Sequence, residues 1–302
     1  MTLVSSRGHS MPESVIVKVT NPQGPSDMRE ALRELTFYRT TYPDLPIPKP
    51  EIHYLGHDEK SGWNLLVMED LSFTHRIPRH PYQWTRAELR PVLQSYALLH
   101  AASLLPAEGE RQWLNPRHES QLDFEAIPVE AAIIQKAGIW RSLPRLSDLI
   151  DCARTSCLKY ESTNVCLLHN DTTPTNAPLP KHLESMPAIL IDWQDAGVGM
   201  AEMDLAYLDL QPFGSARAIP RAELLALYWN FREGIEGPIL SPGERRERQL
   251  HADLVMALWL IRPGSRDALK PYPAGSYPRM HWDSQFKIVY NRLVRLSAEI
   301  LP

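Results

Sequence analysis

Hydrophobic residues in the first seventy positions follow two different periods. The run Ser14–Val19, rich in β-branched residues, predicts a strand that carries Lys18. Between residues 27 and 42 the apolar residues recur at helical spacing, which predicts an amphipathic helix. Two further apolar runs, Ile52–Leu55 and Trp63–Met68, lie on either side of a polar turn and predict a pair of strands. The predicted order of this region is therefore strand, helix, strand, strand.

After about residue 70 the pattern changes to longer stretches with helical spacing. These stretches lie at about residues 92–103, 146–160, 221–235, 244–261 and 284–301. Two apolar runs between them, Val165–Leu168 and Ala188–Ile191, are too short for helices and predict buried strands. We therefore expect an α+β protein with a small N-terminal lobe, residues 1–70, and a larger, mostly helical lobe, residues 71–302. The junction of two such parts is a natural place for a ligand.

Charge and composition exclude several classes of protein. The chain has 32 Lys and Arg against 36 Asp and Glu, a net charge of −4, so no basic excess favours nucleic acid or an anionic membrane. Its longest wholly apolar run, residues 254–261, is far shorter than the ~20 residues of a membrane-spanning helix. The first ten residues lack the apolar core of a signal peptide, and three cysteines do not make a disulfide framework. We expect a cytoplasmic protein that binds neither nucleic acid nor membranes.

Residues suited to metal and phosphate chemistry follow the two short apolar runs. The segment His169–Asn176, which contains Asp171, follows the first run, and Asp192 follows the second. A single Asp or Asn in a loop is usually a turn residue. Here Asp171, Asn176 and Asp192 occur together, at a defined spacing after two apolar runs. Mg²⁺ prefers one or two hard oxygen ligands together with phosphate oxygens, and a further carboxylate can orient an attacking hydroxyl. The pattern favours phosphoryl transfer.

The same residues carry a family resemblance. His169-x-Asp-x-x-x-x-Asn176, then an apolar run and Asp, resembles the catalytic and metal-binding loops of the protein-kinase-like fold. The residues of these motifs are most similar to those of the aminoglycoside phosphotransferase and choline-kinase-like family. Segments similar to that family, in its order, are Val15–Lys18, Glu34–Arg39, Leu66–Leu71, Leu98–Ala101, Leu167–Asp171, Ile189–Gln194, Gly197–Gly199 and Asp204–Tyr207. The resemblance spans about residues 15–210.

The resemblance implies a two-lobed protein-kinase-like fold, α+β in class, whose N-terminal lobe is mixed α/β and short at its start. It also implies an enzyme, a kinase that uses ATP and Mg²⁺ to phosphorylate a hydroxyl of a small molecule. Acceptor classes that fit the family are an aminoglycoside-like compound, an amino alcohol, a sugar or another alcohol.

The resemblance also implies roles for individual residues. Asp171 would orient the acceptor hydroxyl, and Asn176 and Asp192 would hold Mg²⁺ against the ATP phosphates. Lys18 would contact the α- and β-phosphates. It would be steadied by Glu34, although Glu30 lies one turn away on the same helix face.

Two further parts of the site follow from the same comparison. Backbone groups near the strand end would hold the adenine; these residues are Met68, Glu69, Asp70 and Leu71. Asp204 would act as a structural support of the larger lobe rather than as a reacting group.

The chain departs from the family at its start and within the loop. Only Met1–Glu13, with a single glycine, can supply a first strand and a loop over the phosphates before Lys18. This departure keeps a second hypothesis open, that of a catalytically silent kinase-like protein that binds nucleotide or acts as a scaffold. Asn170 stands where the family often has glycine.

Acidic residues of the larger lobe raise the question of the acceptor. As a group they could hold a cationic acceptor, but single acidic residues on helices are usually solvated, so no acceptor residue is assigned. These residues are Glu202, Asp209, Asp253, Asp267 and Asp283.

Overall fold

The computed structural model describes most of the chain. The described ranges are residues 14–21, 24–78, 84–102, 122–143, 145–160, 165–171, 173–182, 186–211, 219–262 and 277–301, with the single positions 114, 265, 270 and 273. Predictions that concern Met1–Glu13 and Asp267 fall outside them.

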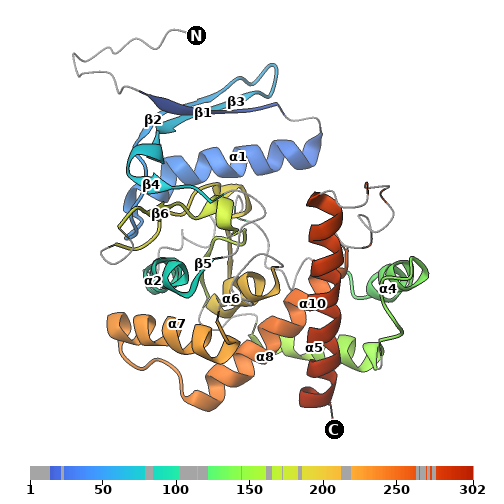
Figure 1. The fold of residues 1–302 in the computed structure, drawn as a ribbon. Helices are drawn as coiled ribbons and strands as arrows, with labels where there is room; N and C mark the ends of the chain where they lie inside the picture. Colours follow the sequence, from blue (N-terminus) through green and yellow to red (C-terminus); the bar gives the residue numbers. More distant parts are fainter. Residues whose placement is uncertain are drawn as a thin grey trace, which may run out of the picture.

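The N-terminal part is an antiparallel sheet covered on one face by a helix (Figure 1). The strands β1 (Val15–Thr20), β3 (Asn64–Glu69) and β2 (Ile52–His57) lie side by side in that order, and α1 (Pro25–Thr40) runs beneath them. The register pairs Lys18 of β1 with Leu66 of β3. Because successive strand residues point to opposite faces, Lys18 is directed toward α1 while its neighbours Val17 and Val19 are about half exposed on the other face.

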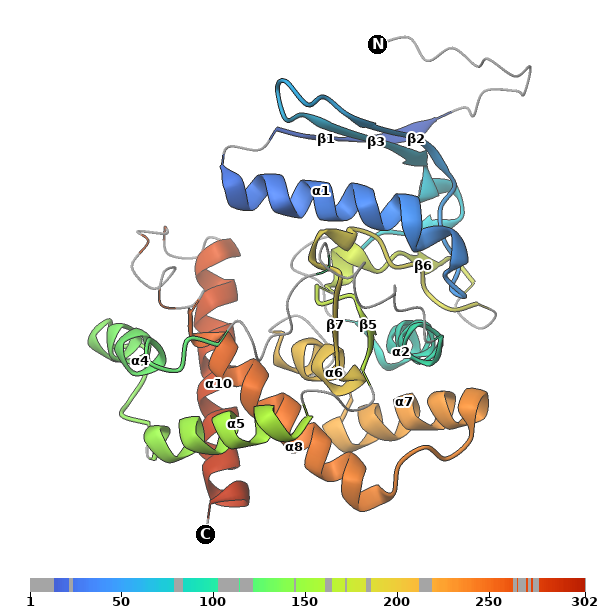
Figure 2. The same cartoon turned by 180° about the vertical axis from the view of Figure 1, so that it is seen from behind.

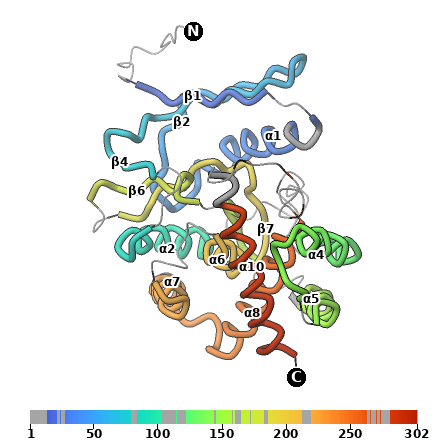
Figure 3. The backbone as a smooth tube through the Cα atoms, turned by 45° about the vertical axis from the view of Figure 1, so that its right-hand side comes forward, coloured from blue at the N-terminus to red at the C-terminus, as the bar shows by residue number. Residues whose placement is uncertain are grey.

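The rest of the chain is mainly helical. Its longer helices are α2 (Arg86–Ala101), α4 (Ile127–Lys136), α5 (Leu146–Tyr160), α6 (Ala201–Leu210), α7 (Arg221–Glu236), α8 (Pro242–Trp259) and α10 (Tyr277–Ile300). In the views of Figures 1 and 3, α2 and α7 lie on one side of α6, and α4 and α5 lie on the other. This architecture confirms the predicted fold class, a small strand-rich N-terminal region and a larger helical part. The predicted domain boundary near residue 70 stays a prediction.

Two short strand pairs position the polar loops (Figure 2). The strand β5 (Cys166–Leu168) pairs with β7 (Gly197–Gly199), so the segment after β5 lies near the segment before β7. The strand β6 (Leu179–Pro180) pairs with β4 (His75–Arg76). Three short 3₁₀ helices complete this region: η2 (Leu71–Phe73), η4 (Pro174–Asn176) and η5 (Trp193–Asp195). A fourth, η1 (Tyr42–Asp44), follows α1.

The predicted strand at Ala188–Ile191 is wrong. Two of its amides, those of Ile189 and Ile191, donate to the Pro178 and Asn176 carbonyls of one neighbouring segment. Pro178 has no amide to return a bond, and the Asn176 amide donates to the Thr173 carbonyl, so no ladder is completed. A short buried apolar run therefore forms a strand only where the neighbouring segment can return its hydrogen bonds. The segment nevertheless brings Asp192 to the polar loop, because the Ile191 amide donates to the Asn176 carbonyl at 3.0 Å.

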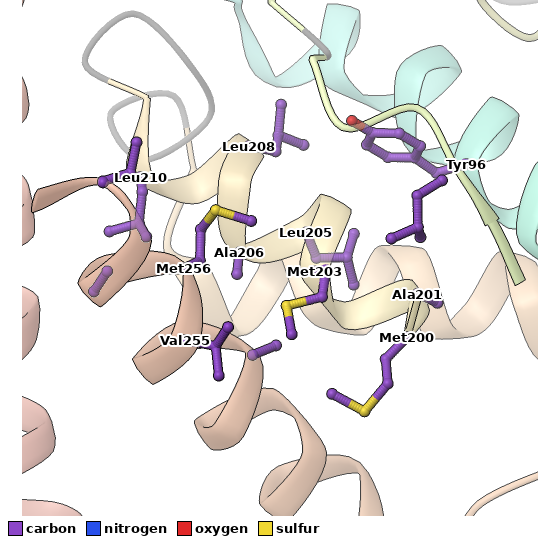
Figure 4. Packing of buried hydrophobic residues seen from close by; sticks show 14 of the residues in the cluster. Tyr96, Met200, Ala201, Met203, Leu205, Ala206, Leu208, Leu210, Val255 and Met256 are labelled. Atoms are coloured by element: carbon purple, nitrogen blue, oxygen red, sulfur yellow. The ribbon is translucent and has the colours of Figure 1, made fainter. Parts of the chain in front are cut away.

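The helix α6 lies at the centre of the helical part. All of its residues are buried except Tyr207, which is partly buried. Figure 4 shows Tyr96 of α2 on one side of α6, and Val255 and Met256 of α8 on the other. A helix that is surrounded on every side has a fixed position, so polar groups on α6 can serve as fixed points for the loops next to it.

No helix among the described residues is long and apolar enough to cross a membrane.

An aromatic stack joins the N-terminal helix to the loop region. The rings of Phe37 on α1 and Trp193 on η5 are nearly parallel, with their centres 4.3 Å apart. The centre of the His169 ring lies 4.5 Å from that of Trp193. Next to the stack, the Arg33 guanidinium donates to the Gln194 carbonyl at 2.6 Å. The position of α1 is therefore tied directly to the segment that carries Asp192.

Replacing Phe37 with alanine tests this joint. Phe37 is fully buried, so Phe37→Ala should lower the free energy of unfolding by about 3–5 kcal/mol, the usual cost of a phenylalanine-sized cavity. The matched control is Leu32→Ala on the same helix. Leu32 is 38% exposed, and its replacement should cost less than about 1 kcal/mol. Urea unfolding measures both, and equal costs would contradict the role of the stack.

Candidate active site

The charged centre of the site joins β1 to a loop far along the chain. The ammonium of Lys18 lies 2.9 Å from a carboxylate oxygen of Glu34 on α1 and 2.7 Å from Oδ1 of Asp192. Burial lowers the pKa of Lys18, but attraction to the two carboxylates outweighs it and the pKa is raised. Burial raises the pKa of Glu34, and Lys18 opposes that shift. Of the two glutamates considered from the sequence, the structure places Glu34 against Lys18.

Asp192 has an unusual backbone conformation. Its φ of 65° and ψ of 70° lie in the left-handed region, which costs a residue with a Cβ about 1–3 kcal/mol. The turn directs the chain from the buried segment into η5, and Asp192 contacts Lys18 there. Strain of this kind persists only where surrounding contacts determine the conformation, and it is typical of functional sites.

The side chain of Asp171 is held by two neutral donors. The Tyr207 hydroxyl donates to Oδ1 at 2.8 Å, and the Asn176 amide group donates to Oδ2 at 3.0 Å. Burial raises the pKa of Asp171 to about 7, and the carboxylates of Asp195 and Asp192 add to the increase. The hydrogen bonds from Tyr207 and Asn176 act in the opposite direction.

The backbone before Asp171 is held by one buried carboxylate. Asp204 on α6 accepts from the amide of His169 at 2.9 Å and from the amide of Asn170 at 2.8 Å. Asn170 has a φ of 64°, the left-handed region that glycine and asparagine tolerate best, and its side chain donates to the Asp195 carbonyl at 2.9 Å. Asparagine therefore stands at a position whose backbone also suits glycine.

The His169 ring braces the same loop. Its Nε2 lies 3.0 Å from the Ile191 carbonyl, which can only accept, so Nε2 carries the proton. Its Nδ1 then accepts from the Asp171 amide at 3.3 Å. Burial lowers the pKa of His169, which keeps this ring neutral.

A second buried histidine, on α2, also contacts the carboxylate of Asp204. His100 on α2 places Nε2 3.2 Å from Asp204 and Nδ1 3.0 Å from the Tyr228 hydroxyl. Burial raises the pKa of Asp204, but the hydrogen bond from His100 and the loop amides outweigh it and the pKa is lowered. Asp204 is therefore an ionised acceptor, which agrees with the support expected from the sequence.

The geometry adds Tyr207, and the pairing of the buried His100 with Asp204, to what the sequence indicates. A signal for Tyr207 was present in the spacing, because it lies three residues after Asp204 and so shares a face of α6. The contact of His100 with Asp204 joins segments 104 positions apart, which no local pattern indicates.

The strand end proposed to hold the adenine is partly committed to internal contacts. The side chain of Asp70 accepts from the Ser72 amide and from the Ser14 hydroxyl. The Glu69 amide donates to the Glu51 carbonyl at 2.9 Å. Met68 and Leu71 are buried. The side chain of Asp70 therefore shapes the turn, and any role of this segment toward a base falls to backbone groups.

The acidic residues of the helical part have a role that differs from both sequence hypotheses. Three of them are buried and paired with arginine, neither solvated nor open to a cationic ligand. Glu202 on α6 accepts from Arg248 at 2.8 and 3.0 Å. The network around the other two joins four helices: Asp209 on α6 pairs with Arg221 and Arg292, and Asp253 on α8 pairs with the same two arginines. Asp283 lines a cavity of about 460 Å³ together with Arg141 and Lys287.

The conformation of Asn170 gives a stability test. Both Asn170→Gly and Asn170→Ala remove the side-chain bond to Asp195, but only alanine places a Cβ in the left-handed region. We expect Asn170→Ala to be less stable than Asn170→Gly by about 1 kcal/mol, measured by chemical denaturation. Equal stability, or a more stable alanine variant, would contradict the backbone conformation described here.

Comparisons with known proteins concern the fold and the family of the chain. No curated protein sequence matches the chain. Among solved structures, a microcompartment-associated aminopropanol kinase superimposes with a TM-score of 0.60 at 14% identity, over 94% of this chain and 86% of that one. The GDP complex of an aminoglycoside 2'-phosphotransferase gives 0.58 at 12% identity, over 89% and 85%. An ADP-bound aminoglycoside phosphotransferase gives 0.52 at 15% identity, over 92% and 88%. At these identities the likeness shows a shared fold.

The sequence comparison goes further than the fold. The model of the phosphotransferase enzyme family matches residues 4–237, which is well over half of the chain and includes Lys18, Glu34, Asp171, Asn176 and Asp192. The resemblance seen in the sequence is confirmed, and with it the prediction of a small-molecule kinase at the level of the family: the chain belongs to the phosphotransferase enzyme family.

Proposed function

We propose that this phosphotransferase moves the γ-phosphoryl group of ATP to a hydroxyl group of a small molecule. The observation that carries the proposal is the contact of Lys18 with both Glu34 and Asp192, which joins the N-terminal sheet to a loop 174 positions away. Beside that contact, Asp171 is held in a defined orientation by Tyr207 and Asn176. Phosphoryl transfer depends on positioning and charge stabilisation, which this arrangement is suited to provide.

Each residue of the site has a place in this reaction. Lys18 binds the α- and β-phosphates, and Glu34 keeps its ammonium in position. Asp171 accepts a hydrogen bond from the acceptor hydroxyl and directs its oxygen toward the phosphorus. The raised pKa of Asp171 is that of a group able to take up a proton near neutral pH. The backbone between Met68 and Leu71 lies against the adenine, with Asp70 fixing the turn.

The donor set fits a magnesium ion. The side-chain nitrogen of Asn176 donates to the Asp171 carboxylate. The side-chain oxygen of Asn176 is therefore the atom that would bind the metal ion. Asp192 supplies a carboxylate, and the bond between Ile191 and Asn176 keeps the two residues adjacent. No cluster of three or more His, Cys, Asp or Glu side chains within the described ranges forms a site of its own. Two oxygen ligands completed by phosphate oxygens are typical of Mg²⁺, which offsets phosphate charge when bound.

The acceptor is an alcohol whose class is set by the helical part. The structural relatives include kinases named for aminoglycosides and for aminopropanol, so both compound classes belong in the test. Glu202, Asp209 and Asp253 are excluded from binding a cationic acceptor in this arrangement, because buried arginines already neutralise them. An aminoglycoside-like compound, an amino alcohol, a sugar and another alcohol are the classes to compare.

The first experiment measures nucleotide consumption by the purified protein with Mg²⁺ and an array of these alcohols, with ATP and GTP in parallel. One acceptor class should give turnover. In the Asp171→Asn variant kcat should fall by about 10²–10⁴-fold, because the group that directs the hydroxyl is lost. The matched control is Asp148→Asn, which removes a carboxylate from an exposed ion pair with Arg145 and should leave turnover unchanged.

Two results would contradict the proposal. Full turnover by Asp171→Asn would remove the assigned role of Asp171. Stabilisation of the protein by nucleotide in a thermal shift assay, without turnover of any acceptor, would instead support the silent kinase-like protein. Loss of nucleotide stabilisation in Lys18→Met is expected both for the enzyme and for a silent protein that binds nucleotide, so that variant tests the nucleotide site alone.

A further inference from the structure

The helix α6 holds the loop of Asp171 at two separate points. Asp204 accepts from the backbone amides of His169 and Asn170, and Tyr207, one turn later, donates to the side chain of Asp171. Residues three positions apart lie on the same face of a helix, so one rigid surface contacts both the backbone and the side chain. A structural role of Asp204 was expected from the sequence. The side-chain contact was not.

We propose that Tyr207 is a positioning residue, which fixes the orientation of the Asp171 carboxylate for the acceptor hydroxyl. The Tyr207–Asp171 distance is 2.8 Å, a good length for a hydroxyl donating to a carboxylate. The inference rests on the proposed function for its kinetic consequence.

The direction of this hydrogen bond is defined. Burial raises the pKa of Tyr207 well above its usual value, and the neighbouring Asp171 adds to the shift. The hydroxyl therefore keeps its proton and donates to the carboxylate. Because the other residues of α6 are buried, the backbone that carries this hydroxyl has a fixed position.

The loop itself offers little else to orient Asp171. The sequence His169–Asn176 contains no lysine or arginine. The hydroxyl of Thr173, two residues after Asp171, lies 2.9 Å from that of Thr175. Among the described residues, the charged groups that raise the pKa of Asp171 most are the carboxylates of Asp195 and Asp192. Within the described part of the loop and its surroundings, the donors to the Asp171 side chain are Asn176 and Tyr207.

The two donors contribute differently to this orientation. Asn176 belongs to the same loop and also donates to the backbone carbonyl of Asp171, so it moves together with the loop. Tyr207 belongs to α6, so its hydrogen bond connects the Asp171 carboxylate to a helix of the buried core. Without the hydroxyl, Asp171 keeps one donor on a shared loop and can turn away from its reactive orientation.

A kinetic comparison tests the proposal. Tyr207→Phe keeps the ring and removes only the hydroxyl; we expect kcat to fall about 10–100-fold, because reactions of this kind are sensitive to misplacement of about 1 Å. The nucleotide KM should change less than about twofold, since Lys18, Glu34 and Asp192 keep their contacts. An unchanged kcat in Tyr207→Phe would overturn the proposal.

A matched tyrosine separates positioning from stability. The buried Tyr42 hydroxyl also donates over 2.8 Å, to the Pro50 carbonyl away from Asp171. Tyr42→Phe should shift the unfolding midpoint about as much as Tyr207→Phe while leaving kcat unchanged. An equal fall of kcat in both variants would overturn the proposal, because it would reflect loss of stability alone.

A double-mutant cycle tests whether Tyr207 acts through Asp171. If it does, Tyr207→Phe should cause no further fall in the Asp171→Asn background. An additive fall would overturn the proposal, because it would show that Tyr207 acts elsewhere.

A spectroscopic measurement keeps the test independent of turnover. In protein labelled with ¹³C at the tyrosine Cζ, the Tyr207 resonance is assigned by its loss in Tyr207→Phe. It should shift in Asp171→Asn and stay in place in Asp148→Asn. A resonance that does not respond to Asp171→Asn overturns the inference, whatever the turnover. A shift in a protein that turns over no acceptor supports the Tyr207–Asp171 contact while refuting the proposed function.

Discussion

The carboxylate of Asp204 is the contact on which the geometry of the site depends. It accepts two backbone amides of the loop and a proton-bearing nitrogen of His100, all inside the protein. A buried amide that loses its partner costs about 1–3 kcal/mol, so the two amides alone bind the loop firmly to α6. Asn170 can hold its left-handed conformation because its amide is anchored in this way. Asp171, the next residue, then begins from a defined backbone direction.

Fixing one loop also fixes the second. The backbone amide of His169 is held by Asp204, and its ring donates to the Ile191 carbonyl. The Ile191 amide in turn donates to the Asn176 carbonyl. These bonds place Asp192 next to Asn176 without any regular sheet between them. The stack of Phe37 on Trp193 then connects this pair of loops to α1, which carries Glu34. Lys18 is thus brought to Asp192 by packing as well as by charge.

Much of this arrangement follows from the sequence, and the exceptions have physical reasons. The strand of Lys18 is rich in β-branched residues, the helix of Glu34 has a clear helical period, and the strand before His169 is a short apolar run; all three were predicted. The helix α6 was not predicted, because residues buried on every side leave no polar face to reveal a helical period. The short helix α4 lacks a side-chain cap at its start, which removes the usual signal of a helix N-terminus. Ala188–Ile191 has the composition of a strand, but the segment beside it cannot return the hydrogen bonds, because Pro178 has no amide and the Asn176 amide donates to Thr173. The roles assigned to Asp171, Asn176, Asp192, Lys18 and Glu34 remain predictions, although the structure brings these residues together.

The arginine network bears on where the folding unit ends. The family match stops at residue 237, within a chain whose α6 carries Glu202 and Asp209. Their counter-charges Arg248 and Arg292 lie on α8 and α10, beyond that limit. A shortened chain cut at the family boundary would leave Glu202 without Arg248, and it would leave Asp209 with Arg221 alone. The last two long helices are therefore internal parts of the lobe rather than an appendage, and fragments for expression or domain exchange have to include them.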